Sequence, residues 1–175
     1  MGKGYALKCR NCGYEFSANL GVGFMFPMAY QGTMEAGKAG KLGKEVKQFL
    51  EEHPDGVLDC DIVVLQCSEC GELGRAPDLS MYVPGEHSPV PSSGNWSGSF
   101  PHEGISYVAP WELDQYTLVK RYDHRCGKCK GKMKIIKEKE LEKLIRSAGS
   151  GDHPTKIPCP RCKQPLWLGE MLMWD

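Results

Sequence analysis

The sequence predicts an α+β protein made of two small β units, each with an inserted helix, joined by a long loop. Three observations lead to this fold class. Cysteines occur in four C-x-x-C pairs, two segments show the periodicity of an amphipathic helix, and a stretch rich in Pro, Gly and Ser separates the two halves. The length of 175 residues suits one domain or two small ones, because compact domains commonly span about 100 to 150 residues.

The cysteines are the most informative residues. Two thiolates separated by two residues can face one metal ion from a tight turn, and two such turns complete a tetrahedral shell of four sulfurs around zinc. The sequence therefore predicts two zinc ions, bound by Cys9, Cys12, Cys67, Cys70, Cys126, Cys129, Cys159 and Cys162. A disulfide framework is the alternative, but the total of nine cysteines is odd and the N-terminus shows no secretory signal pattern.

An imperfect internal repeat suggests how the four pairs combine. Each half contains a cysteine pair, a short strand, an amphipathic helix and a second cysteine pair. We therefore expect residues 1–83 and 111–175 to form one unit each, with one ion in each unit. The first ion is then bound by Cys9, Cys12, Cys67 and Cys70. The second is bound by Cys126, Cys129, Cys159 and Cys162.

The motifs Lys8-Cys-Arg-Asn-Cys-Gly-Tyr14 and Cys67-Ser-Glu-Cys-Gly71 resemble the zinc-ribbon family, and the first is also similar to a rubredoxin knuckle. Both families place a glycine after the second cysteine, and glycine can take a positive φ at no steric cost. The third and fourth pairs have Lys130 and Lys163 at this position, so we expect their turns to be strained or differently formed. The resemblance implies a metal-stabilised fold element and names no partner.

Zinc is favoured over iron as the bound metal. Two separate sites with unequal turns are typical of repeated structural sites, and four thiolates leave no position on zinc for a catalytic water. The alternative is a rubredoxin-like protein that transfers electrons through iron, because a shell of four thiolates accepts either metal.

Two segments have apolar residues at helical spacing. The first covers 41–53 and stops before Pro54. The second carries Leu141, Leu144 and Ile145 on one face, with acidic residues near its start and basic residues near its end, as the helix dipole favours. Upstream of the first helix, glycines at every third residue either fray the chain or allow close packing: Gly37, Gly40 and Gly43.

Other apolar segments predict strands and packing. Alternation over 57–66 predicts a strand in which the unpaired Cys60 is a buried thiol. The uncharged segment 21–30 is expected to pack beneath the first helix. The tail 166–174 is interpreted as a final strand, and an exposed face on it would contact a partner or a second copy of the chain.

The stretch 84–110 joins the two halves. It is rich in Pro, Gly and Ser, which favours loop structure. It also contains Trp96, Phe100 and Tyr107, and flexible linkers are poor in aromatic residues. We therefore expect this loop to fold back and dock.

Charges are segregated although the net charge is zero. Residues 51–87 hold nine acids and one base, whereas residues 119–147 hold eleven bases and four acids. Basic side chains with aromatic neighbours can contact phosphates and stack on bases. The candidate nucleic-acid-binding residues are Lys120, Arg121, Lys132, Lys134, Lys137 and Lys139. A solvated basic face is the alternative.

These observations predict a zinc-stabilised binding module, an adaptor or regulator in the cytoplasm that recognises nucleic acid or a nucleic-acid-handling protein through its basic second half. No apolar run is long enough to span a bilayer, so no membrane partner is expected. No phosphate-binding loop or nucleophile motif supports an enzyme. The alternatives are the iron electron-transfer protein and a structural zinc protein that forms homo-oligomers through its C-terminal apolar segment.

Overall fold

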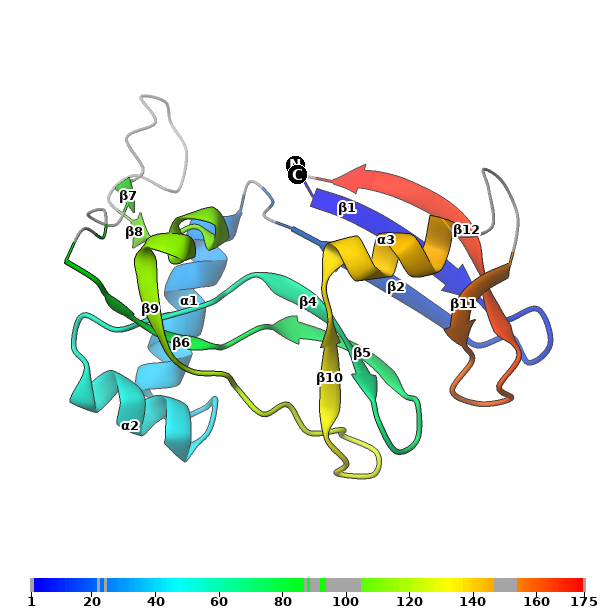
Figure 1. The fold of residues 1–175 in the computed structure, drawn as a ribbon, viewed down its shortest axis with the longest axis horizontal. Coiled ribbons are helices and arrows are strands. Elements are labelled where there is room, and N and C mark those ends of the chain that lie inside the picture. The colour runs from blue at the N-terminus through cyan, green and yellow to red at the C-terminus, as the bar shows by residue number, and fades with distance from the viewer. Residues whose placement is uncertain are drawn as a thin grey trace. The chain divides into compact units, whose positions relative to one another are not determined.

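The computed structural model of the chain describes residues 2–21, 23, 25–86, 88, 92–93, 105–146 and 154–174. These residues form the expected α+β fold, with small antiparallel sheets and few helices (Figure 1). The chain divides into two compact units, each assembled from separated segments. Unit 1 comprises Met1–Gly23, Ile62–Ala76 and Asp123–Asp175, and unit 2 comprises Phe24–Asp61 and Pro77–Tyr122.

The two units interleave along the sequence, which differs from the consecutive units expected at 1–83 and 111–175. The difference arises because the two ends of the chain pair with each other in unit 1. Strand β1 (Gly2–Lys8) is antiparallel to the last strand, β12 (Pro165–Trp174), in a register that sets Gly2 opposite Trp174. Because unit 1 contains both the first and the last strand, the two units do not correspond to an N-terminal and a C-terminal half of the sequence.

The larger sheet of unit 1 has four strands in the order β11-β12-β1-β2. Strand β2 (Glu15–Leu20) forms a hairpin with β1, and β11 (Pro154–Pro158) forms one with β12. The tail predicted as a final strand is therefore confirmed as β12. It pairs with both halves of the chain, and the side chain of Leu166 at its start is fully buried.

The smaller sheet of unit 1 has the order β10-β4-β5, formed by β4 (Ile62–Cys67), β5 (Leu73–Pro77) and β10 (Met133–Ile136). Helix α3 (Glu138–Arg146) follows β10 and lies along the larger sheet in Figure 1. Its predicted stripe is buried, because Leu141 and Ile145 pack in one core cluster with Leu7 and Leu166 of the sheet. The residues that follow this helix, 147–153, lie outside the described residues.

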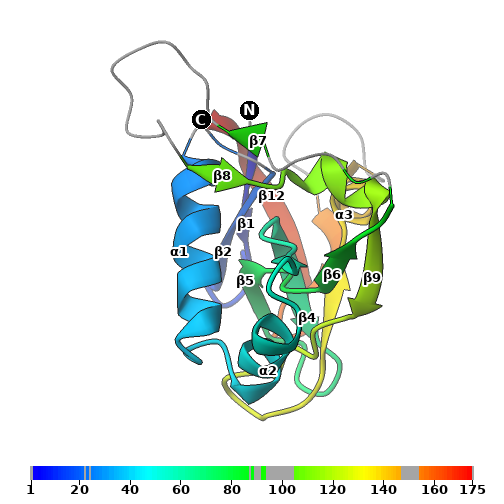
Figure 2. The ribbon, with the colours of Figure 1, turned by 90° about the vertical axis from the view of Figure 1, so that its left-hand side faces the viewer.

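Unit 2 combines two helices, α1 (Phe26–Lys38) and α2 (Lys44–Glu52), with a three-stranded sheet (Figure 2). The sheet order is β3-β6-β9, from β3 (Val57–Leu58), β6 (Met81–Pro84) and β9 (Tyr116–Lys120). A small ladder joins β7 (Ser92–Ser93) to β8 (Ser106–Tyr107), and a 3-10 helix, η1 (Pro110–Gln115), precedes β9.

The first predicted helix, 41–53, is confirmed as α2, which starts after Gly43 at a φ of 105°. Helix α1 is an element that the sequence pattern did not predict. It begins at Phe26 with a proline in its first turn, and its buried side includes Tyr30 and Gly37. Residues 26–30 of the predicted apolar segment thus form the start of a helix.

The predicted strand 57–66 is divided into β3 and β4 by residues 59–61. There the backbone instead bonds to the chain before β6, with Asp59 N–H donating to Ser80 O at 2.8 Å. Cys60 is buried, as expected, and its thiol lies 3.5 Å from the carbonyl oxygen of Leu58. Within the predicted loop 84–110, Tyr107 packs edge-on against Phe26, whereas Trp96 and Phe100 lie outside the described residues.

Candidate metal centres

The eight paired cysteines gather into two quartets, both within unit 1. The outer site consists of Cys9, Cys12, Cys159 and Cys162. The inner site consists of Cys67, Cys70, Cys126 and Cys129. In each site the four Sγ atoms lie within 4.8 Å of one another, so each could hold a metal ion. Cys60 belongs to unit 2 and joins neither site.

The ligand pairing predicted from the internal repeat is wrong. The first cysteine pair joins the fourth, and the second joins the third. Strand pairing is the physical reason. The β1–β12 ladder aligns Lys8 with Trp167 and so brings the first pair beside the fourth. The β4–β10 ladder aligns Cys67 with Met133 and brings the second pair beside the third.

The sulfur separations match a metal tetrahedron and exclude disulfides among these cysteines. In the outer site the Sγ atoms of Cys9 and Cys162 are 3.4 Å apart. In the inner site the Sγ atoms of Cys70 and Cys126 are 3.7 Å apart. A disulfide would require about 2.05 Å, whereas four sulfurs at about 2.3 Å from a central zinc would be about 3.8 Å from one another. No disulfide joins any of the nine cysteines.

All four cysteine turns share one backbone pattern. The N–H of the first cysteine donates to the carbonyl five residues later, as from Cys9 to Tyr14 at 2.7 Å. The carbonyl of the same cysteine accepts from the N–H four residues later, as at Cys9 from Gly13 at 3.0 Å. The equivalent bonds occur at Cys67, Cys126 and Cys159. The spacing C-x-x-C thus folds into the same turn each time, independently of which turn it later meets.

The fifth residue of each turn has positive φ, and the conformational strain of the turn depends on whether this residue is glycine or lysine. Gly13 and Gly71 take φ values of 70° and 78°, while Lys130 and Lys163 each take 63°. A side chain in this region costs roughly 1 to 2 kcal/mol. The expected strain at the lysine turns is therefore confirmed, although these turns are formed in the same way as the glycine turns. Each site pairs one glycine turn with one lysine turn.

Hydrogen bonds within and between the turns favour the thiolate form of some of the cysteines. A backbone hydrogen bond from Cys70 lowers the pKa of Cys67 to about 6, although burial opposes the shift. The side chain of Asn11 lowers the pKa of Cys162 to about 6. In Cys12 a backbone hydrogen bond from Tyr14 favours the thiolate, but burial and the surrounding thiols outweigh it and raise the pKa to about 12. A quartet therefore becomes fully ionised only when a cation balances its charge.

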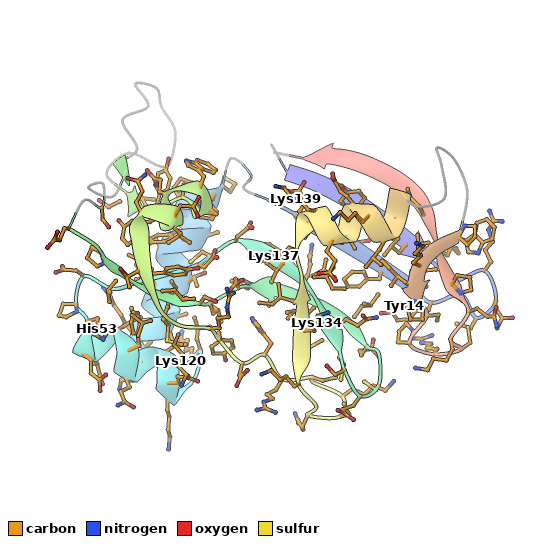
Figure 3. The ribbon with its side chains drawn as sticks, in the orientation of Figure 1. Tyr14, His53, Lys120, Lys134, Lys137 and Lys139 are labelled. Atoms are coloured by element: carbon orange, nitrogen blue, oxygen red, sulfur yellow. The ribbon has the colours of Figure 1, made fainter. Side chains whose placement is uncertain are left out.

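The six predicted nucleic-acid-binding residues are divided between the two units. Lys120 and Arg121 belong to unit 2, and the other four belong to unit 1. Three of the six form ion pairs, which join Lys120 to Glu45, Lys132 to Asp123 and Lys134 to Glu140. Lys137 and Lys139 are exposed at the junction of β10 and α3, where Figure 3 labels them with Lys134.

Two stacked arginines at the outer site were not predicted. The guanidinium carbon of Arg10 lies 3.6 Å from the ring centre of Trp167, and that of Arg161 lies 5.4 Å from the ring centre of Tyr14. A surface pocket of about 370 Å³ is lined by Arg10, Asn11, Gln164, Pro165 and Trp167. The available signal was an arginine between the cysteines of each outer pair, in C-R-N-C and C-P-R-C.

No protein-family model, curated protein or solved structure matches this chain. Among the residues that the structure describes, no helix has the length and apolar character needed to cross a bilayer. The function is therefore inferred from the geometry of the two sites and from the surface around them.

Proposed function

We propose that the chain is a zinc-stabilised binding module, in which one structural zinc ion in each site holds unit 1 together. The observation that carries the proposal is the closed donor set. Each site offers four thiol groups at separations that suit a tetrahedral zinc ion, and such a shell leaves no position for water or substrate. The metal ions then stabilise the fold, and the partner binds to the surface of the protein.

The proposed ions are large contributors to stability. Structural zinc supplies roughly 10 to 16 kcal/mol in small zinc-finger peptides, whereas net domain stability is usually about 5 to 15 kcal/mol. The outer site fastens the turn after β1 to the turn before β12, and the inner site fastens the turn after β4 to the turn before β10. Each ion would therefore fix a strand pairing between segments far apart in sequence.

Charge supports nucleic acid, or a nucleic-acid-handling protein, as the partner of unit 1. Unit 1 contains 16 basic and 10 acidic side chains, a net of +6, and unit 2 contains 6 basic and 12 acidic ones, a net of −6. Two zinc tetrathiolates at −2 each leave unit 1 at about +2. We assign the phosphate contacts to the exposed lysines in and next to β10 and at the start of α3, namely Lys132, Lys134, Lys137 and Lys139. The guanidinium plane of Arg10 beside Trp167 offers a stacking surface for a base.

The first test is the metal itself. Elemental analysis of the purified chain should find two zinc ions per molecule and no visible absorption. Iron in place of zinc, with a visible spectrum that changes on reduction, would favour the rubredoxin-like alternative. We place the protein in the cytoplasm, where thiols stay reduced.

The second test concerns the partner. Binding to short single-stranded and double-stranded oligonucleotides should be tighter than millimolar at low salt and should weaken as salt rises. The variant K137Q/K139Q should lower the slope of log affinity against log salt by about 1.4 to 1.8, at roughly 0.7 to 0.9 per lost phosphate contact. The control K38Q/K41Q removes two exposed charges from unit 2. Equal effects of both variants would reject the assignment of the contacts to Lys137 and Lys139, and binding that is no tighter than millimolar or that salt does not change would reject nucleic acid as the partner.

A further inference from the structure

A lysine of the outer site reaches the backbone of the inner site. Lys163 follows the outer ligand Cys162 in sequence. Its ammonium donates to the carbonyl oxygen of the inner ligand Cys70 at 3.1 Å and to that of Pro160 at 3.4 Å. One side chain thus bonds to the ligand turns of both sites.

A second link joins the two glycine turns. The carbonyl of Tyr14 closes the turn at Cys9, and the carbonyl of Glu72 closes the turn at Cys67. The side chains of these same two residues bond to each other, with Tyr14 Oη donating to Glu72 Oε1 at 3.3 Å. The other carboxylate oxygen, Glu72 Oε2, lies 3.4 Å from the ammonium of Lys128, which stands between two inner ligands.

The first link depends on the lysine side chain at position 163. Its φ of 63° is a conformation that glycine would adopt without strain. The lysine carries the ammonium that bonds to Cys70, and a glycine would lose this bond. Lys130 has the same φ in the inner site. Within the part of the chain that the structure describes, however, no contact of its ammonium reaches the outer site.

We propose that the two sites load with metal cooperatively, because ordering the turns of one site also orders a turn of the other through Lys163–Cys70 and Tyr14–Glu72. The inference rests on the proposed function in one respect, that both sites bind metal. The first ion fixes its two turns and with them one partner of each link. The second ion then binds to a turn that is already partly ordered, so its binding loses less conformational entropy.

The experiment measures the zinc affinity of the outer site with the inner site intact and with it disabled by C67S/C70S. Competition with a chromophoric chelator gives the affinities, and Co²⁺ substitution shows by its absorption which sites are filled. We expect the disabled inner site to weaken the outer site about tenfold, within the usual range of couplings between sites. By thermodynamic reciprocity, disabling the outer site with C9S/C12S must weaken the inner site by the same factor.

Matched variants assign the coupling to the two links. K163G should reduce the tenfold effect to a few-fold or less, and K130G, which relieves the same backbone strain, should leave it unchanged. Y14F removes the donor of the second link and should reduce the coupling further. Its control is Y5F, which removes another Tyr–Glu hydrogen bond of 3.3 Å, from Tyr5 to Glu142, that joins β1 to α3.

The outcomes separate this inference from the proposed function. Two zinc ions that bind with unchanged affinities when the other site is disabled would overturn the coupling and leave the proposed function standing. Coupling that survives K163G and Y14F, or that K130G and Y5F reduce equally, would overturn the assignment to these links. A chain that binds no zinc would overturn the proposed function itself.

Discussion

Two glycines of one helix should respond to alanine with opposite signs. Both Gly32 and Gly37 lie in α1. A methyl group at Gly37 would lie 2.9 Å from Leu50 Cδ1, 3.1 Å from Val46 Cγ1 and 3.4 Å from Leu58 Cδ1. These neighbours are buried, and the β-branched Val46 cannot rotate away easily. A methyl group at Gly32 would meet nothing within 4 Å.

The expected change in the free energy of unfolding is the sum of two opposing contributions. Alanine gains about 1 kcal/mol over glycine inside a helix, and this gain applies at both positions. Overpacking a filled core typically costs about 1 to 3 kcal/mol, and this cost applies only at Gly37. We therefore expect G32A to stabilise unit 2 by about 1 kcal/mol and G37A to destabilise it by about 1 kcal/mol.

Amide hydrogen exchange of α1 in the metal-loaded protein measures these changes within unit 2. Denaturant unfolding followed by circular dichroism provides an independent value. The difference between the two variants, about 2 kcal/mol by the same two terms, is the informative quantity because the helix-propensity gain cancels in it. Equal stabilisation by both variants would show that α2 does not pack against Gly37, and the close approach of the two helices would be refuted.

Three further predictions test both units. A strong chelator should abolish amide protection in unit 1 and leave unit 2 protected, because all eight ligands lie in unit 1; protection that persists in unit 1 would contradict this. Leu141→Ala should cost about 3 kcal/mol in denaturant unfolding, since the side chain is fully buried in the core of unit 1, and a loss below about 1 kcal/mol would contradict that packing. Burial raises the pKa of Cys60 from 9.0 to about 12, so the native thiol should resist alkylation at neutral pH as followed by mass spectrometry. Because the folded pKa is the higher one, the stability that this thiol contributes is complete below pH 9 and declines as pH rises towards 12; rapid labelling of native Cys60 would refute its burial.

The identity of the metal ligands could be predicted from the sequence, whereas their pairing could not. The C-x-x-C turn is local, and all four copies form the same hydrogen bonds. Which turns meet is decided by strand pairs such as β1 with β12, whose partners lie at opposite ends of the chain. The internal repeat reflected the similarity of the turns, and similar turns need not belong to consecutive sites. The repeat also grouped both glycine turns together, whereas each site contains one of each kind.

Tertiary packing explains the other differences. Helix α2 was predictable because its apolar residues recur at helical spacing. Helix α1 was not, because it contains two glycines and depends on close packing of Gly37 against Val46 and Leu50. The basic residues cluster in sequence, but the chain passes from unit 2 to unit 1 between Tyr122 and Asp123. One run of charge is therefore divided between two units.

The interleaved pairing of the cysteines is tested most directly by replacing both ions with an NMR-active cadmium isotope and correlating each cadmium signal with cysteine β-protons. The structure predicts one cadmium coupled to Cys9, Cys12, Cys159 and Cys162. It predicts the other coupled to Cys67, Cys70, Cys126 and Cys129. A single cadmium coupled to both Cys9 and Cys67 would contradict the arrangement of the two sites.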